Sequence, residues 1–304
     1  MNASGAPPDA PVPPPGLLVL VSTPIGNLGD LSPRARQTLQ GADLVCCEDT
    51  RRTRALLTYA GIRGKRLLSL HARNEGARVD EVVSRLSAGA VVALVSDAGT
   101  PVVSDPGARL VRAALDGGAT VSAVPGPSAA LTAVVVSGLP SARFCVEGFL
   151  ARRGAERRRR LASLAVEERT SVIFEAPGRL AATLAELVEA CGGSRAVVVA
   201  RELTKRHEEV WRGSLAEAAE AFAAREVRGE VVVVLGPAPA AAPADDAQVA
   251  AALGRHRGTG ASWRDATEAV AAELGLPRRL VYDRAIELRG ARSAETDETG
   301  GMPG

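Results

Sequence analysis

Short apolar runs alternate with longer segments in which apolar residues recur at helical spacing, almost from the start of the chain. In the first half the apolar runs are LLVLV, DLVCCED, RLLSL, AVVALVSD and TVSAVPG. The helical segments between them cover residues 33–41, 51–60, 75–87 and 108–116. Apolar strands separated by helices are typical of a mostly parallel sheet covered on both faces. We therefore predict an α/β domain over residues 16–140.

The pattern restarts after Pro140 with the runs FCVEGFL, TSVIFEA, RAVVVARELT and EVVVVLG. Helical segments around 179–191 and 215–224, together with a basic helix after FCVEGFL, lie between them. These runs are fewer and longer than those of the first half, and they predict a second α/β domain over residues 141–237. The fold class is thus α/β, with two α/β domains and a small helical segment after them.

The C-terminal part begins with PAPAAAPADDA, whose composition is that of a linker, which we place at 238–247. Residues 248–290 form a small helical domain, in which 263–288 has the spacing of a helix-turn-helix hairpin broken by GLP. This helical domain either packs on the α/β domains or contacts nucleic acid, and the sequence does not distinguish the two roles. The Pro-rich residues 1–15 have no signal-peptide pattern and are expected to be a disordered tail, as are 291–304.

Composition fits a globular protein of two domains with full cores. The chain has 304 residues, of which 46% are hydrophobic and 24% charged. No run approaches 18 apolar residues, so no membrane helix is predicted and we expect a cytoplasmic protein. The aromatic share of 3% argues against sheets that stack several RNA bases on aromatic side chains. Net charge is only +2, yet six arginines fall within residues 152–160.

Cysteines and histidines give no sign of a metal site or of disulfides. None of Cys46, Cys47, Cys145 and Cys191 stands in a CxxC pair, which indicates reduced thiols. The three histidines lack the spacing of metal ligands, so no metal is predicted.

The loops that follow the apolar runs carry the candidate chemistry, because ligands bind parallel sheets at the carboxyl ends of their strands. TPIGNLGDL, after the first run, is neither GxGxxG nor a Walker A motif, which disfavours dehydrogenase and NTPase functions. Its glycines still allow backbone N–H groups to face a ligand. Taken alone, the motif is better explained as an ordinary strand-to-helix turn.

EDTRRTRALL places two acids at the end of the second strand, Glu48 and Asp49, before Thr50 as a candidate N-cap. Three arginines follow in the first helical turn: Arg51, Arg52 and Arg54. Cations there oppose the helix dipole, which suggests that they grip phosphate or pair with the two acids.

VSDAGTPVVSDPG makes two SD turns after the fourth apolar run, and we expect the second, Asp105–Gly107, to cap the helix that begins at Ala108. In VPGPSA, Ser128 is a candidate N-cap. Glu175 in FEAPGRL and Glu202 in ARELTK end apolar strands and could hold a ribose diol or an ammonium group.

Six motifs stand in a fixed order across residues 17–236: TPIGNLGDL, EDTRRTRALL, VSDAGTPVVSDPG, VPGPSA, FEAP-R and ARELTK-HEE. Together they resemble the tetrapyrrole-methylase superfamily and, within it, the ribosomal RNA small subunit methyltransferase I group. The C-terminal segment looks like that group's small helical domain. Two positions depart from the group's pattern: Gly178 replaces a usual histidine in FEAPHR, and Ala151 replaces a usual proline after GFL.

The resemblance implies a 2′-O-methylation of a cytidine ribose in the decoding region of 16S rRNA, with S-adenosylmethionine as cofactor. It implies a cofactor cleft between the two α/β domains, a homodimer, and 16S rRNA or an assembled 30S subunit as partner, with no membrane. Methylation of a small tetrapyrrole-like substrate and a non-catalytic RNA-binding role are the alternatives. The residues implied to bind the cofactor are Pro24, Gly26, Asp97, Ala98, Gly99, Thr100, Val102, Ser128, Ala129, Glu175, Ala176, Arg201, Glu202, Leu203 and Gly229.

Methyl transfer to a hydroxyl needs alignment of the reactants and a group that takes up the hydroxyl proton. Asp30, Glu48 and Asp49 are the candidates for contacting the 2′-OH, and Lys205 is the alternative base if burial lowers its pKa. The residues expected to contact RNA phosphates are Asn27, Arg51, Arg52, Arg54, Arg152, Arg153, Arg157, Arg158, Arg159 and Arg160. A solvated helix face would also explain the arginines from 152 to 160.

Overall fold

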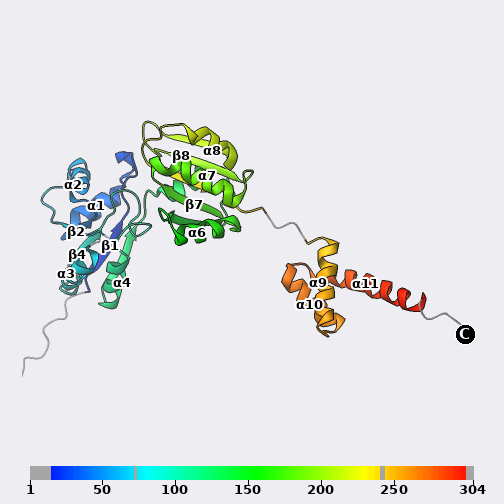
Figure 1. Cartoon of the computed structure of the whole chain (residues 1–304). Helices are drawn as coiled ribbons and strands as arrows, with labels where there is room; N and C mark the ends of the chain where they lie inside the picture. Colours follow the sequence, from blue (N-terminus) through cyan, green and yellow to red (C-terminus); the bar gives the residue numbers. More distant parts are fainter. Residues whose placement is uncertain (1–14, 72–73, 240–243, 299–304) are drawn as a thin grey trace, which may run out of the picture. The chain divides into compact units, whose positions relative to one another are not determined.

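The computed structural model describes residues 15–71, 74–239 and 244–298 of the chain. The chain divides into two compact units, Met1–Ala238 and Pro239–Gly304. Within the described residues, the larger unit contains two five-stranded sheets and the smaller contains three helices (Figure 1).

The first sheet is parallel throughout, as predicted, with strand order β3-β2-β4-β1-β5. Its strands are β1 (Leu17–Val21), β2 (Leu44–Cys47), β3 (Leu67–Ser69), β4 (Val91–Leu94) and β5 (Thr120–Val124). Two helices, α1 (Pro33–Gly41) and α2 (Thr50–Tyr59), pack on one face. The other face carries α3 (Glu75–Ser87) and α4 (Ala108–Asp116). Alternate residues of β1 point to opposite cores, which is why the run LLVLV is apolar throughout.

The second sheet is mixed, with strand order β6-β7-β10-β8-β9. Its strands are β6 (Phe144–Phe149), β7 (Thr170–Glu175), β8 (Ala196–Arg201), β9 (Glu209–Ser214) and β10 (Val231–Leu235). Only β6 and β7 are parallel, since β10 runs antiparallel to β7 and β8, and β9 antiparallel to β8. The prediction of fewer strands in this half was wrong, because β9 is a half-buried edge strand whose polar residues hide it in the sequence.

Helices of both halves of the chain cover the second sheet. On one face lie α6 (Ala155–Ala165), α7 (Leu180–Cys191) and α8 (Leu215–Ala223). The opposite face packs against α5 (Ala129–Ser137), which comes from before the sequence-based domain boundary at Pro140. Ile25 from the first strand's loop joins the same core as Leu203. This shared core joins the two α/β domains in one unit.

The smaller unit is a three-helix bundle of α9 (Asp246–Gly258), α10 (Trp263–Leu274) and α11 (Arg278–Glu298). The predicted hairpin corresponds to α10 and α11, which meet at the left-handed Gly275. The sequence did not predict α9, which starts inside the expected linker at a capping box of Asp245 and Gln248. Residues 291–298, expected in a tail, continue α11. The other parts of the predicted tails and linker, 1–14, 240–243 and 299–304, lie outside the described residues.

The four cysteines are free thiols, with Cys46 and Cys47 buried in β2. Over the described ranges, no helix is long and apolar enough to cross a membrane. The same ranges hold no group of three or more His, Cys, Asp or Glu placed to bind a metal ion.

Candidate active site

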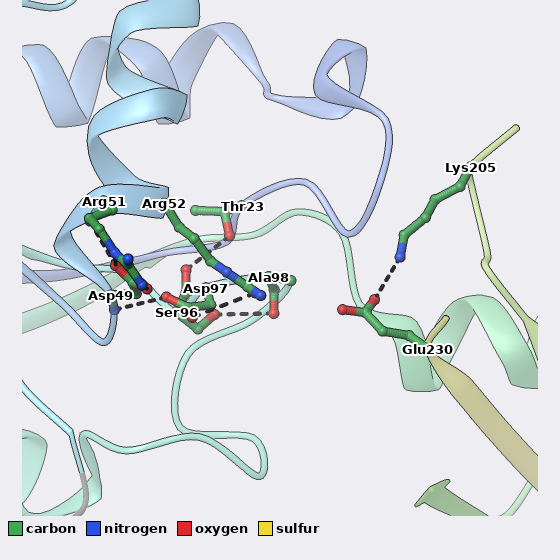
Figure 2. Close-up of polar contacts among 9 residues, drawn as sticks. All are labelled: Thr23, Asp49, Arg51, Arg52, Ser96, Asp97, Ala98, Lys205 and Glu230. Atoms are coloured by element: carbon green, nitrogen blue, oxygen red, sulfur yellow. Dashed lines mark hydrogen bonds and ion pairs between the residues drawn. The ribbon is translucent and has the colours of Figure 1, made fainter. Parts of the chain in front are cut away.

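The loops after β1 and β4 are hydrogen-bonded to each other. Thr23 N donates to the Gly99 carbonyl at 2.9 Å, and Gly99 N donates back to the Thr23 carbonyl at 3.0 Å. The Thr23 hydroxyl also donates to the Ser96 carbonyl, and the Ser96 hydroxyl to the Ala98 carbonyl, at 3.3 Å each (Figure 2). Because β1 and β4 are adjacent parallel strands, these bonds fix both loops at one edge of the sheet.

The first turn of α2 lies beside these loops. Asp49 is its N-cap rather than Thr50 as predicted, and the Asp49 carboxylate accepts from Arg51 N at 2.8 Å. Arg51 pairs with Asp49 at 3.2 Å and Arg52 with Asp97 at 3.6 Å (Figure 2). The hydrogen bonds from Arg51 lower the pKa of Asp49 and keep it ionised. These acids compensate the unfavourable position of the arginines at the helix N-terminus.

The expectation that Asp105–Gly107 caps α4 is confirmed for the N-cap position, which is Gly107, but no side chain of this turn forms a cap hydrogen bond. A carboxylate from another helix accepts from the first turn instead. Glu75 Oε1 lies 3.1 Å from Gly107 N, 3.0 Å from Arg109 N and 3.4 Å from Leu110 N. Glu75 is buried, and its carboxylate accepts from three N–H groups at the start of α4 that have no partner within that helix. Asp105 is consequently free to face the pocket.

The loop from Ala98 to Gly107 is held in an unusual backbone conformation. Val102 and Ser104 have φ of 74° and 65°, in the left-handed region that residues other than glycine seldom adopt and that is most unfavourable for the β-branched Val102. Gly107 has φ of 125°, and a Cβ there would lie 2.7 Å from Leu94 Cδ2, so glycine is required. Such strain persists only where surrounding contacts over-determine the backbone, and it is typical of functional loops.

A pocket of about 340 Å³ lies at these loops and is lined by both α/β domains. Nine of the predicted cofactor residues line it: Asp97, Ala98, Gly99, Thr100, Ser128, Ala129, Glu175, Ala176 and Gly229. Arg52, predicted for RNA, lines it too. Sequence reasoning missed the remaining lining residues: Ile25, Val103, Ser104, Asp105, Phe149, Phe174, Pro177, Glu230, Val231 and Val232. The apolar ones follow or end strands and cannot be told from core residues by pattern.

Six predicted cofactor residues do not line this pocket: Pro24, Gly26, Val102, Arg201, Glu202 and Leu203. Pro24 borders a smaller neighbouring hollow that shares Arg52 and Asp97 with the pocket. Leu203 is buried in the core shared by the two domains, and Arg201 pairs with Glu209 at 2.9 Å.

Glu202 acts on the pocket through Gly229. Its Oε1 accepts from Lys205 Nζ at 2.7 Å and from Glu230 N at 3.0 Å. A Cβ on Gly229, whose φ is 85°, would lie 2.2 Å from that oxygen. Only glycine allows the backbone to approach the carboxylate this closely.

Glu175 ends β7 and is held entirely by protein groups. Its side chain is fully buried, Oε1 accepts from Ala176 N at 2.7 Å, and Oε2 accepts from the Thr183 hydroxyl at 2.6 Å. Thr183 accepts in turn from Arg157 at 2.9 Å. Glu175 therefore positions the backbone at Ala176 in the pocket wall.

Acid groups near the pocket differ in their proton affinity. The pKa of Asp105 is raised to about 6, mainly by burial and also by the charges of Glu48 and Asp97, while a hydrogen bond with Ser96 acts in the opposite direction. Burial and the Asp97 charge also raise the pKa of Glu48. Asp30, by contrast, is exposed on the short helix Leu28–Asp30 and does not line the pocket.

Lys205 does not have the lowered pKa that a neutral base needs. Burial lowers the pKa, but the hydrogen bonds to Glu202 at 2.7 Å and Glu230 at 3.2 Å outweigh it, and the net shift is upward (Figure 2). The ammonium group is held charged, so the structure argues against Lys205 as the base.

The arginines predicted to contact RNA are mostly exposed, with one exception. Arg157 is buried, and its guanidinium donates to Glu186, Thr183 and the Ala151 carbonyl. It is a structural residue and does not reach the surface. The exposed ones are Arg51, Arg52, Arg54, Arg152, Arg153, Arg158, Arg159 and Arg160. Asn27 is exposed, but its side chain caps Gly29 N at 3.0 Å.

Comparison with known proteins identifies the family to which these sheets and loops belong. The model of the family described as Tetrapyrrole (Corrin/Porphyrin) Methylases matches residues 17–219, which include the first sheet, β6 to β9 of the second sheet, and the pocket residues from Ile25 to Pro177. The chain belongs to the tetrapyrrole methylase family. Tetrapyrrole methylases of known structure share its fold: uroporphyrin-III-C-methyltransferase from Thermus thermophilus aligns with TM-score 0.53 and 20% identity, over 73% of this chain and 94% of that one.

Within the tetrapyrrole methylase family, this chain is similar to proteins named ribosomal RNA small subunit methyltransferase I. The relative from Mycobacterium tuberculosis is 49% identical over 276 residues, covering 90% of this chain and 96% of the relative. The relative from Synechocystis is 43% identical over 275 residues, covering 90% and 98%. In Thermotoga maritima, 98% of the relative matches only 220 residues of this chain, fewer than the 238 residues of the larger unit.

The two departures from the motifs of this group have local explanations. A Cβ on Gly178 would meet nothing within 4 Å, so a side chain is neither required nor excluded there. At Ala151 the carbonyl accepts from Arg157 at 3.0 Å, a bond that does not depend on the side chain at 151.

Proposed function

We propose that this protein transfers a methyl group from S-adenosylmethionine to the 2′-hydroxyl of a cytidine in the decoding region of 16S rRNA. The observation that carries the proposal is the 43–49% identity, over about 90% of the chain, to proteins named ribosomal RNA small subunit methyltransferase I. The pocket between the two α/β domains supports it, because it combines a rigid acidic edge with apolar walls.

The lining residues fit the cofactor. An ammonium group suits Asp97, and an adenine ring suits the apolar side chains of Ile25, Phe174 and Val232. S-adenosylmethionine supplies an electrophilic methyl group on a sulfonium. The chain's part is to bind and orient, which the bonded loops at Thr23 and Gly99 do without rearrangement.

Asp105 is the group best placed to take up the proton of the hydroxyl. It lines the pocket, and its pKa of about 6 leaves it ionised yet basic at neutral pH. Asp49, with its lowered pKa, is the weaker base, and Asp30 lies away from the pocket. We place Glu48 beside Asp105 as the charge that keeps its proton affinity high.

The exposed arginines at the N-terminus of α2 and on α6 would hold RNA phosphates on both sides of the pocket. Arg52 lines the pocket from the first domain. Arg159 and Arg160 lie on the second domain, in a hollow that shares Phe149 with the pocket. Binding should therefore weaken as salt rises. Replacing Arg159 and Arg160 by alanine with no change in RNA affinity would remove this part of the proposal.

A homodimer is part of the proposal, with action in the cytoplasm, where ribosomal subunits are assembled. Its support is an apolar surface on α5, where Leu131 and Val135 lie one turn apart and are 52% and 79% exposed. Val135→Glu should shift the mass measured by light scattering from dimer to monomer. A wild-type protein that is already monomeric would refute the dimer.

The function is tested with labelled S-adenosylmethionine and 30S subunits that lack the modification. We expect label in 16S rRNA and a ribose methyl at one cytidine by mass mapping, with free 16S rRNA as the second substrate. Label found only in a small macrocycle would refute the proposal, and absence of cofactor binding by calorimetry would indicate a non-catalytic protein.

A further inference from the structure

A second hollow, of about 320 Å³, adjoins the pocket and has no role in cofactor binding as described above. Its walls come from the end of β6 and from α6, and include Glu147, Phe149, Arg159 and Arg160. We refer to it as the outer hollow. Phe149 borders both the outer hollow and the pocket, so a ligand can extend past this ring from one to the other.

Phe149 is turned outward by the backbone. The pairing of β6 with β7 shifts register between Val146 and Gly148, and Gly148 has φ of 70°. A bulge of this kind redirects the side chains that follow it. Phe149 is consequently 61% exposed, with one side near Phe174 at a ring-centre distance of 5.6 Å. The low aromatic content argues against a sheet on which several RNA bases stack. A single exposed ring such as Phe149 is still sufficient to stack on one base.

The carboxylate of Glu147 keeps an oxygen that can accept a further hydrogen bond. Its side chain is only 7% exposed, and Oε1 lies 3.2 Å from the Cys145 thiol, whose pKa is raised by burial so that it donates. Oε2 lies 2.5 Å from Arg160 Nε in an ion pair, and no described group donates to it with the geometry of a hydrogen bond. The ion pair compensates the charge of Glu147, and Oε2 retains lone pairs for a donor supplied by a ligand in the outer hollow.

We propose that the outer hollow receives the target base of the RNA substrate, with Phe149 stacked on the base and Glu147 Oε2 accepting from its exocyclic amino group. An enzyme that acts on a nucleotide inside folded RNA takes it out of the stack and reads its edge. A carboxylate selects the amino group of cytosine over the carbonyl oxygen of uracil at the same position. The ribose would then lie at the pocket, beside Phe149. This inference rests on the proposed function and adds the subsite that selects the base.

The stacking role is tested with Phe149→Ala and Phe149→Tyr, with Val166→Ala as the matched control. Val166 is 75% exposed at the end of α6 and lines neither cavity. Loss of a stacked base weakens single-stranded RNA binding by about tenfold to a hundredfold. We expect a KM for 30S subunits raised by about that factor in Phe149→Ala and nearly normal in Phe149→Tyr. Because Phe149 also borders the cofactor pocket, Phe149→Ala should weaken cofactor binding measured by calorimetry as well, but by less than it raises the KM for RNA. Equal KM values for Phe149→Ala and Val166→Ala would overturn the stacking role.

The recognition of the amino group by Glu147 is tested with Glu147→Ala, which removes the acceptor, and with two RNA substrates. One carries the target cytidine, and the other carries a pyrimidin-2-one riboside that lacks the amino group. We expect wild type to prefer the cytidine by about tenfold or more in kcat/KM and Glu147→Ala to lose most of this preference. If both proteins show the same preference, Glu147 does not read the base. If wild type methylates neither RNA, the proposed function fails and the base subsite fails with it.

Discussion

Replacing Glu75 by alanine should uncover the first turn of α4. The change removes the acceptor of the N–H groups of Gly107, Arg109 and Leu110, at 3.1, 3.0 and 3.4 Å. A side-chain cap contributes about 1 kcal/mol, within a range of 0.5–2. The bonds to Gly107 and Leu110 are buried, and each N–H left unsatisfied adds about 1–3 kcal/mol unless water enters. Water that enters beside the shortened side chain would relieve part of this cost, so we expect a net loss at the lower end, about 2–4 kcal/mol.

Thermal unfolding monitored by circular dichroism measures this loss. For a unit of this size, about 2–4 kcal/mol lowers Tm by roughly 5–15 °C. Glu75→Gln keeps the Oε1 acceptor and loses only the charge at the helix N-terminus, so it should lower stability by about 1 kcal/mol. Asp80→Ala, at an exposed position of the same helix, is the matched control and should stay within about 0.5 kcal/mol of wild type.

The same variant should affect the pocket. The loop that ends at Gly107 contains Val102 in a left-handed conformation, which the Glu75 bonds help to hold. Glu75→Ala should therefore weaken cofactor binding measured by calorimetry, even well below its Tm. If Glu75→Ala unfolds at the same temperature as Asp80→Ala, the hydrogen bonds from α4 to Glu75 do not stabilise the protein and the reasoning fails.

Three further changes test other contacts. If the ionised form of Asp105 is the base, wild-type kcat should rise with pH and level off above an apparent pKa near 6. Asp105→Asn should lower kcat and abolish that rise. A pH profile of kcat that is unchanged in Asp105→Asn would contradict the role of Asp105 as base. Arg157→Met should destabilise the protein by about 2 kcal/mol in chemical denaturation, whereas Arg158→Met, at an exposed position, should change stability by less than about 0.5 kcal/mol. Gly229→Ala should lower the free energy of unfolding by about 1–2 kcal/mol, because residue 229 has a left-handed backbone conformation. The new Cβ should also displace Glu202 and weaken cofactor binding. A cofactor affinity equal to that of wild type would show that the pocket wall tolerates the change.

The parallel first sheet could be predicted because its strands are uninterrupted apolar runs between amphipathic helices. The helix bounds at 33–41, 75–87 and 108–116 agree with the structure for the same reason. The edge strand β9 could not be predicted, since it is half-buried on both sides and its residues alternate irregularly between polar and apolar. α9 was missed because its alanines and glycines give no clear helical stripe.

The site was predictable where it depends on backbone loops at strand ends. Its side-chain chemistry was not. Asp105 faces the pocket because Glu75, thirty positions earlier in the chain, caps α4 in its place, and no local pattern reports such a contact. Arg157 looks like its five neighbouring arginines in sequence, and only the packing of α6 against α7 buries it.

Helix α5 precedes the predicted domain boundary at Pro140 in the sequence, but it packs against the sheet of the second domain. Ala130, Ala133 and Val134 pack against the second sheet, and Arg212 of β9 donates to the Ser137 carbonyl at 3.2 Å. A fragment ending at Pro140 would expose these apolar residues, and one beginning there would leave a sheet face bare. The two α/β domains are therefore not exchangeable modules, and we expect them to unfold in one transition. A chimera between family members should cross over after Val124, so that α5 stays with the sheet that it covers.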